Sequence, residues 1–135
     1  MSELPGDPSS EALARGWSPL LEALPQGVLL AAPSGRLLRA NPAALRILGL
    51  GREALLAHSL EDLAAWVDPG GEAGPLAPSD RVPVRRVLGW RRDTGETVWL
   101  DWAAQTLEAD QVLVSFEDVT ETRFLSARLE RLTKL

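Results

Sequence analysis

The spacing of apolar residues along the chain changes between a period of two and a period near three and a half. A period of two is typical of half-buried strands, because successive strand side chains point to opposite faces. It predicts strands over residues 28–32, 36–40, 84–92, 97–107 and 111–117. The longer period is typical of helices with one buried face, and it predicts helices over residues 43–48, 52–57 and 60–67. We therefore expect an α+β domain.

Helical spacing also appears before the first predicted strand. Residues 1–10 are rich in Pro, Gly and Ser and are predicted to be disordered. The apolar positions that follow them at helical spacing are Leu13, Trp17, Leu20 or Leu21, and Leu24. Gly16 and Pro19 interrupt this spacing, so we expect two helical pieces. Pro19 suits the first turn of the second piece, where a proline loses no backbone hydrogen bond.

The last predicted strand passes directly into a helical tail. Asp118 follows the strand and is a residue type that commonly caps a helix N-terminus, and Glu121 stands three residues on, as in a capping box. The tail carries a narrow apolar stripe at Leu125, Leu129 and Leu132. This stripe predicts either a plain surface helix or the start of a parallel two-helix linker. A sheet that continues into a polar-faced helix suits a connection that carries a signal out of the domain.

The strand predicted over residues 97–107 has two different faces. One face is apolar and is expected to meet the helices across the core: Val98, Leu100 and Trp102. The other face is mixed and points outward: Trp99, Asp101 and Ala103. Because an exposed tryptophan leaves a large apolar surface in water, we expect the N-terminal helix or a partner subunit to cover Trp99.

Composition narrows the class of protein. The chain has 135 residues, 45% hydrophobic and 24% charged, which suits one soluble domain with a single core. A net charge of −5 argues against a nucleic-acid-binding face. The absence of cysteine excludes disulfides and cysteine-based zinc sites. No apolar run reaches the about 18 residues of a membrane span, so we expect a cytoplasmic location and no membrane contact.

Candidate catalytic residues are few. His58 is the only histidine, and its neighbour Ser59 lacks the glycines of a nucleophile elbow, so a hydrolytic triad has no support. Glu61 and Asp62 are adjacent and point in different directions on a helix, which excludes a paired-carboxylate site. The glycine pairs are not followed by the Lys-Ser/Thr of a phosphate loop. We therefore expect no catalytic residue, no metal site and no enzymatic activity in this chain.

Four stretches stand in an order that is typical of one family. They are Leu24-Pro25-Gln26-Gly27 with the apolar run after it, residues 35–44, residues 92–100, and Glu117-Asp118-Val119-Thr120. Together they resemble a PAS domain, and the last is similar to the Asp-Ile-Thr end of that family. The resemblance implies a five-stranded antiparallel sheet of order 2-1-5-4-3 with short helices on one face. It also implies a lead-in and N-terminal cap helix over residues 1–24, a PAS core over 25–118, and a C-terminal signalling helix over 119–135.

Ligand binding in the family depends on a region that differs here. In PAS domains, the region corresponding to residues 68–83 leads into a long helix beside the ligand pocket, and it supplies haem ligands. Here Pro75, Pro78 and Pro83 interrupt it, and each interior proline costs a helix about 3 kcal/mol. His58 lies outside this region, and the cysteinyl–flavin chemistry of light-sensing relatives needs a cysteine. We therefore expect no haem, flavin or other cofactor.

Large side chains are available to occupy the interior. Trp66, Trp90 and Trp102 either line a cavity for a planar ligand or fill the core, and we favour filling because protein interiors tolerate few voids. The residues expected to line a pocket or to form the core are Val28, Leu30, Leu45, Leu48, Leu63, Trp66, Trp90, Leu100, Trp102, Val114 and Phe116.

The resemblance implies a sensory and dimerisation module of a bacterial signalling protein. Asp118, Val119 and Thr120 would relay the signal from the sheet to the C-terminal helix and on to a histidine kinase or diguanylate cyclase effector outside this chain. A homodimer is expected, with a seam formed by Leu13, Trp17, Leu20, Leu24, Trp99, Leu125, Leu129 and Leu132. Its other partners would be an effector domain or partner protein and a small-molecule ligand. The alternative is a ligand-free protein-interaction module with a filled core.

Overall fold

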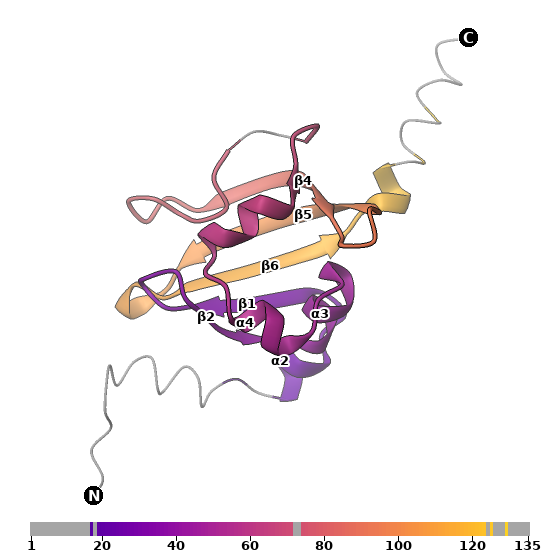
Figure 1. Ribbon diagram of the computed structural model, residues 1–135. Coiled ribbons are helices and arrows are strands. Elements are labelled where there is room, and N and C mark those ends of the chain that lie inside the picture. Colours follow the sequence, from indigo (N-terminus) through magenta and orange to yellow (C-terminus); the bar gives the residue numbers. More distant parts are fainter. Residues whose placement is uncertain (1–16, 18, 72–73, 124, 126–128, 130–135) are drawn as a thin grey trace, which may run out of the picture.

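The computed structural model describes residues 17, 19–71, 74–123, 125 and 129. The elements, in chain order, are α2 (Pro19–Ala23), β1 (Gly27–Ala31), β2 (Leu37–Ala40), α3 (Pro42–Leu48), α4 (Arg52–Leu56), the 3₁₀ helix η1 (Glu61–Trp66), β3 (Val67–Asp68), β4 (Val84–Arg91), β5 (Thr97–Thr106), the 3₁₀ turn η2 (Glu108–Asp110) and β6 (Val112–Asp118). After β6 the backbone is helical at residues 120–123, 125 and 129. Figure 1 shows this helical segment leading away from the end of β6.

One antiparallel sheet organises the fold, in the order β2-β1-β6-β5-β4-β3. Without β3 this is the predicted order 2-1-5-4-3, which is confirmed. The sheet has six strands rather than five because the third predicted helix ends early. Its first residues form η1. Val67 then adopts an extended conformation and pairs with Trp90 of β4, and Asp68 pairs with Gly89 of the same strand.

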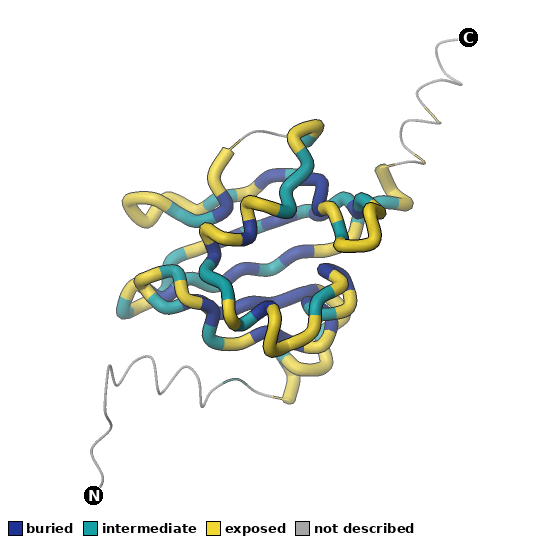
Figure 2. Tube along the Cα trace, in the orientation of Figure 1, coloured by how far each residue is buried: buried dark blue, intermediate teal, exposed yellow. Residues whose placement is uncertain are grey.

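The helices and the core cluster lie on one face of the sheet (Figures 1 and 2). Inward side chains alternate along β5 with half-exposed ones, as the sequence pattern predicted. Fully buried leucines come from every layer, among them Leu29 of β1, Leu48 of α3, Leu63 of η1 and Leu100 of β5. Each side chain of this size contributes about 1.5–3 kcal/mol of hydrophobic stabilisation on burial. Burial of these two layers therefore holds the sheet and the helices together.

Asn41 joins three elements at the start of α3. Its Oδ1 accepts hydrogen bonds from the Ala44 N–H and the Val28 N–H, both at 2.9 Å. Its Nδ2 donates to the Leu21 and Gln26 carbonyls, also at 2.9 Å each. Asn41 is therefore the N-cap of α3, and it is fully buried because every polar atom of its side chain has a partner.

Strand β1 is buried on both faces, which its sequence did not reveal. Leu29 belongs to the core cluster, whereas Val28 and Leu30 are buried on the opposite, outer face. Both residues are buried hydrophobic residues, but they lie outside the core cluster that contains Leu29. A strand buried on both sides is apolar throughout, so its pattern cannot indicate which residues face the helices. Arg39 is the cross-strand partner of Leu30, and its guanidinium carbon lies 6.0 Å from the Trp17 ring centroid.

Candidate functional site

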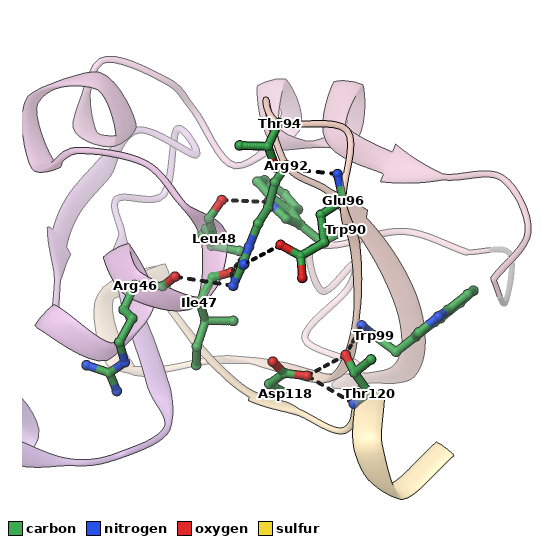
Figure 3. Close-up of polar contacts among 10 residues, drawn as sticks. All are labelled: Arg46, Ile47, Leu48, Trp90, Arg92, Thr94, Glu96, Trp99, Asp118 and Thr120. Atoms are coloured by element: carbon green, nitrogen blue, oxygen red, sulfur yellow. Dashed lines mark hydrogen bonds and ion pairs between the residues drawn. The ribbon is translucent and has the colours of Figure 1, made fainter. Parts of the chain in front are cut away.

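The end of β6 is joined to the exit helix by hydrogen bonds within three residues. The Asp118 carboxylate accepts from the Thr120 N–H at 2.9 Å and from the Thr120 hydroxyl at 2.5 Å (Figure 3). The Val119 carbonyl accepts from the Arg123 N–H at 2.8 Å and is the first helical acceptor. The N-cap position is therefore Val119, and Asp118, which was predicted to be the N-cap, stands one residue before it. The reason is that Val119 is still bonded to the sheet, through its N–H and the Trp99 carbonyl at 2.7 Å.

Both backbone groups of Trp99 in β5 bind this junction. Its carbonyl accepts from Val119, and its N–H donates to the Thr120 hydroxyl oxygen at 2.8 Å. The Thr120 hydroxyl therefore accepts from β5 and donates to Asp118, so one side chain connects β5, β6 and the exit helix. Hydrogen bonds to an ionised carboxylate are shorter and stronger than neutral ones. This network fixes the first helical turn to the sheet.

The Trp99 side chain lies on the outer face of the sheet, close to residues of the exit helix and of the β3–β4 edge. The Arg123 guanidinium carbon lies 4.2 Å from the centroid of its ring, close enough for a cation–π interaction. A Cβ placed on Gly89 would lie 3.1 Å from Trp99 Cζ3, and one on Gly71 would lie 3.2 Å from the same atom. Among the described residues, Arg123 of the exit helix and these two glycines lie close to the indole.

The core tryptophans form two separate stacks. Trp66 stacks on Trp90 with ring centroids 5.6 Å apart, and Trp102 stacks on Phe116 at 5.4 Å. Trp90 and Trp102 are fully buried, and each donates its indole N–H to a backbone carbonyl, at Leu48 (3.0 Å) and Leu76 (2.9 Å) respectively. Trp66 is half-buried and donates to Asp93 Oδ1 at 3.1 Å. These bonds hold the large rings in one position.

A pocket of about 420 Å³ lies beside the proline-rich segment. Its walls come from η1, from residues 74–77 and from β4, and the lining residues are Leu60, Glu61, Ala64, Val67, Gly74, Pro75, Leu76, Ala77 and Arg86. Arg86 is 8% exposed, and it donates to the Gly74 carbonyl and, at 3.4 Å, to the Pro75 carbonyl. The volume falls within the range of about 300–1,000 Å³ that is usual for small-molecule sites.

Comparison with known proteins identifies the family. The family model described as the PAS fold matches residues 21–123. The chain belongs to the PAS family. No curated protein sequence matches it.

Three solved PAS-type structures illustrate the likeness. The first is a domain of the sensory box sensor histidine kinase/response regulator from Geobacter sulfurreducens (21% identity, TM-score 0.60, 84% of this chain and 100% of that one). The second is the PAS domain of BvgS from Bordetella pertussis (16%, 0.55, 95% and 98%). The third is the PAS domain of nitrogen regulation protein NR(II) from Vibrio parahaemolyticus (18%, 0.54, 73% and 94%). At these identities the likeness establishes the PAS fold.

Arg92 is a structurally important residue of this PAS domain that the sequence did not indicate. It follows β4, and its Nε and Nη2 donate to the Ile47 carbonyl at the end of α3, at 3.1 and 2.9 Å. Its Nη1 contacts Glu96 Oε1 at 2.8 Å, across the β4–β5 turn (Figure 3). A cation is favourable at a helix C-terminus, but such residues are usually sought within the helix itself. Here the cation comes from 45 positions further along the chain.

His58 lies just before η1 of the PAS domain and contacts Asp62 and Trp66 of that helix. Its Nδ1 is 3.7 Å from Asp62 Oδ2, and its ring meets the Trp66 ring edge-on at 5.1 Å. The backbone N–H of Ser59 holds the pKa of Asp62 below its usual value. Within the described part of the chain, no three histidine, cysteine or acidic residues gather as metal ligands, and no helix is long and apolar enough to cross a membrane.

The remaining predicted residues divide between the interior and the surface of the PAS domain. Leu45 is partly buried against the core, while Val114 and Phe116 of β6 are buried in it. The predicted seam residues Leu20, Leu125 and Leu129 are exposed, by 72%, 47% and 62%. Trp17, Leu24 and Trp99 are half-buried. Leu13 and Leu132 lie outside the described residues.

Proposed function

We propose that this PAS domain is a cytoplasmic, non-catalytic sensory and dimerisation module that passes a signal from its sheet to its C-terminal helix. The signal would travel through Asp118, Val119 and Thr120, and an effector such as a histidine kinase or a diguanylate cyclase would receive it. The observation that carries the proposal is the Thr120 hydroxyl, which accepts from Trp99 of β5 and donates to Asp118 of β6. PAS domains are typically non-catalytic sensory modules, which agrees with this role.

The junction couples the sheet to the helix because it contains few degrees of freedom. A shift or twist of β5 moves the Trp99 peptide group, and its two hydrogen bonds pull on the residues that begin the helix. Each such bond contributes about 0.5–1.5 kcal/mol net, or about 1.5–3 kcal/mol with a charged partner. The junction thus carries a few kcal/mol, which is the amount needed to change the populations of two helix positions substantially.

The exit helix also supports dimerisation. Leu125 and Leu129 are four residues apart and exposed, as expected for a stripe that meets an equivalent stripe on a second copy. Leu20 of α2 adds a third exposed apolar side chain. A parallel pair of exit helices would place two effector domains side by side, which suits an enzyme that works as a dimer.

The input to the module has two candidate forms. A small molecule in the 420 Å³ pocket is one, because the pocket borders β4 and η1. The second is a partner protein acting on a domain with no ligand, which the complete burial of Trp90 and Trp102 favours. Native mass spectrometry of the protein as purified distinguishes them. A retained molecule supports the first, and a bare mass after gentle desolvation supports the second.

The relay itself is tested by Thr120→Val, which keeps the shape of the side chain and removes its hydroxyl. The Trp99 amide loses its acceptor, so it should exchange hydrogen faster, together with the amides of residues 120–123. Thr122→Val is the matched control, because Thr122 is exposed in the same helical turn. If the two variants exchange alike at Trp99, the hydroxyl is not the connection and the proposed relay is wrong.

A further inference from the structure

The Trp99 indole lies between two parts of the chain that are far apart in sequence. It rests on Gly89, its directly paired neighbour in β4. A Cβ on Gly89 would approach Trp99 Cζ3 and Cη2 to 3.1 and 3.2 Å, tighter than ordinary van der Waals contact. Arg123, in the first turn of the exit helix, lies over the ring, with 4.2 Å between its guanidinium carbon and the ring centroid. The indole therefore lies close both to β4 and to the first turn of the exit helix.

Gly71 brings a third segment to this ring. It follows β3, and a Cβ there would lie 3.2 Å from Trp99 Cζ3 and 3.0 Å from the Gly89 nitrogen. The turn is firmly held, because Asp68 accepts from the Gly70 N–H at 2.7 Å and from Arg91 at 2.9 Å. These contacts keep the pKa of Asp68 below its usual value. A displacement of this turn would therefore push directly on the indole.

The same segment reaches the pocket at its other end. Val67 lines the 420 Å³ pocket, and it stands four residues before Gly71. Val67 and Asp68 are paired with β4, so residues 67–71 move with the edge of the sheet. One short segment thus contacts the pocket at its start and the Trp99 ring at its end.

We propose that Trp99 is a positioning residue: its ring transmits a displacement of residues 67–71, beside the pocket, to Arg123 and so to the exit helix. This inference rests on the proposed function, because it assumes that the position of the exit helix is the output. The route runs through a side chain on the outer face, and it is separate from the backbone hydrogen bonds of Trp99 to Val119 and Thr120. The two routes can therefore be broken independently.

The experiment uses a spin label on the exit helix. The chain has no cysteine, so Leu129→Cys gives a single labelling site in the full chain, and its electron paramagnetic resonance spectrum reports the motion of the helix. Gly71→Ala pushes on the indole. Gly70→Ala is the matched control in the same turn, because its Cβ would meet only Asp68 Oδ1, at 3.1 Å. We expect a shift toward faster label motion with Gly71→Ala and an unchanged spectrum with Gly70→Ala.

The contact between Arg123 and the Trp99 ring is tested by making Gly71→Ala and Gly70→Ala again in a protein that also carries Arg123→Gln. In the Arg123→Gln background, Gly71→Ala should no longer shift the spectrum. In an Arg123→Lys background, where the positive charge is kept, it should shift the spectrum again. An equal shift with and without Arg123 would overturn the inference and leave the hydrogen-bonded relay standing. Should Gly71→Ala fail to melt cooperatively, Trp99→Leu replaces it. Its effect on the label should be lost in the Arg123→Gln background, and an equal effect in both Arg123 backgrounds would overturn the inference. If the spectrum of the label is also unchanged by Thr120→Val, the proposed function itself would be refuted.

Discussion

Replacing Asp118 by alanine tests how the domain holds its exit helix. The variant removes the acceptor of two hydrogen bonds, from the Thr120 N–H at 2.9 Å and the Thr120 hydroxyl at 2.5 Å. Loss of a side chain that bonds the first turn of a helix costs about 0.5–2 kcal/mol. A folded domain has about 5–15 kcal/mol of global stability, so the sheet should survive this loss. The effect should therefore be confined to the junction and the helix.

Hydrogen exchange measured peptide by peptide shows where the free energy is lost. A local loss of about 1 kcal/mol makes exchange about fivefold faster, since 1.4 kcal/mol corresponds to a factor of ten. We expect this increase in residues 119–123, while the strand amides of residues 97–116 other than Trp99 stay protected. The bond between the Trp99 N–H and Thr120 should weaken too, because the Thr120 hydroxyl is no longer oriented by Asp118.

Asp118→Asn is the matched control, because its amide oxygen can still accept both hydrogen bonds although it carries no charge. It should behave between the wild type and Asp118→Ala. Uniform acceleration across the strands and the helix would mean that Asp118 stabilises the whole core, and the account of a local junction would then be wrong. Equal damage by Asn and Ala would show that the charge matters and the hydrogen bonds do not.

Three further predictions concern the interior and the assembly. Trp102→Ala should lower the free energy of unfolding by about 3–5 kcal/mol in urea titration, because a fully buried ring leaves a cavity; Trp102→Phe should cost less, and equal costs would contradict a filled core. The purified protein should show no absorbance above about 350 nm, where haem and flavin absorb, and a coloured preparation that bleaches on denaturation would refute this. The wild type should sediment as a dimer at micromolar concentration, and Trp17→Ala combined with Leu125→Glu should yield monomers. A monomeric wild type would contradict the predicted seam.

Local features of the sequence were reliable where one short segment decides its own structure. Asn41 before Pro42 starts a helix through its own side chain, and it does so here. Alternation along residues 97–106 assigned Val98, Leu100 and Trp102 to the core. The place where strand gives way to helix was located within two residues of Asp118. The order of the strands came from the likeness to PAS domains, because spacing along one strand says nothing about its neighbours.

The candidate site was predicted only in part. Asp118 and Thr120 are two residues apart in the chain, so their contact could be anticipated. The partner of Thr120 in β5 is 21 residues away, and sequence spacing does not reveal which backbone N–H it meets. Likewise, Trp99 was correctly assigned to the outer face, but its contact with Arg123 was not predicted. The closeness of Gly89 and Gly71 to the Trp99 ring becomes evident only when β4 and β5 are paired.

Sequence by itself determined the elements, the inward face of β5 and the junction at which the sheet becomes a helix, because these depend on the preferences of neighbouring residues. Tertiary structure alone decided the sixth strand, the burial of Val28 and Leu30 on the outer face, and the capping of α3 by Arg92. It also decided that Arg123 covers Trp99. The physical reason is that each of these features is a contact between segments far apart in sequence, whose free energy depends on how the whole chain packs.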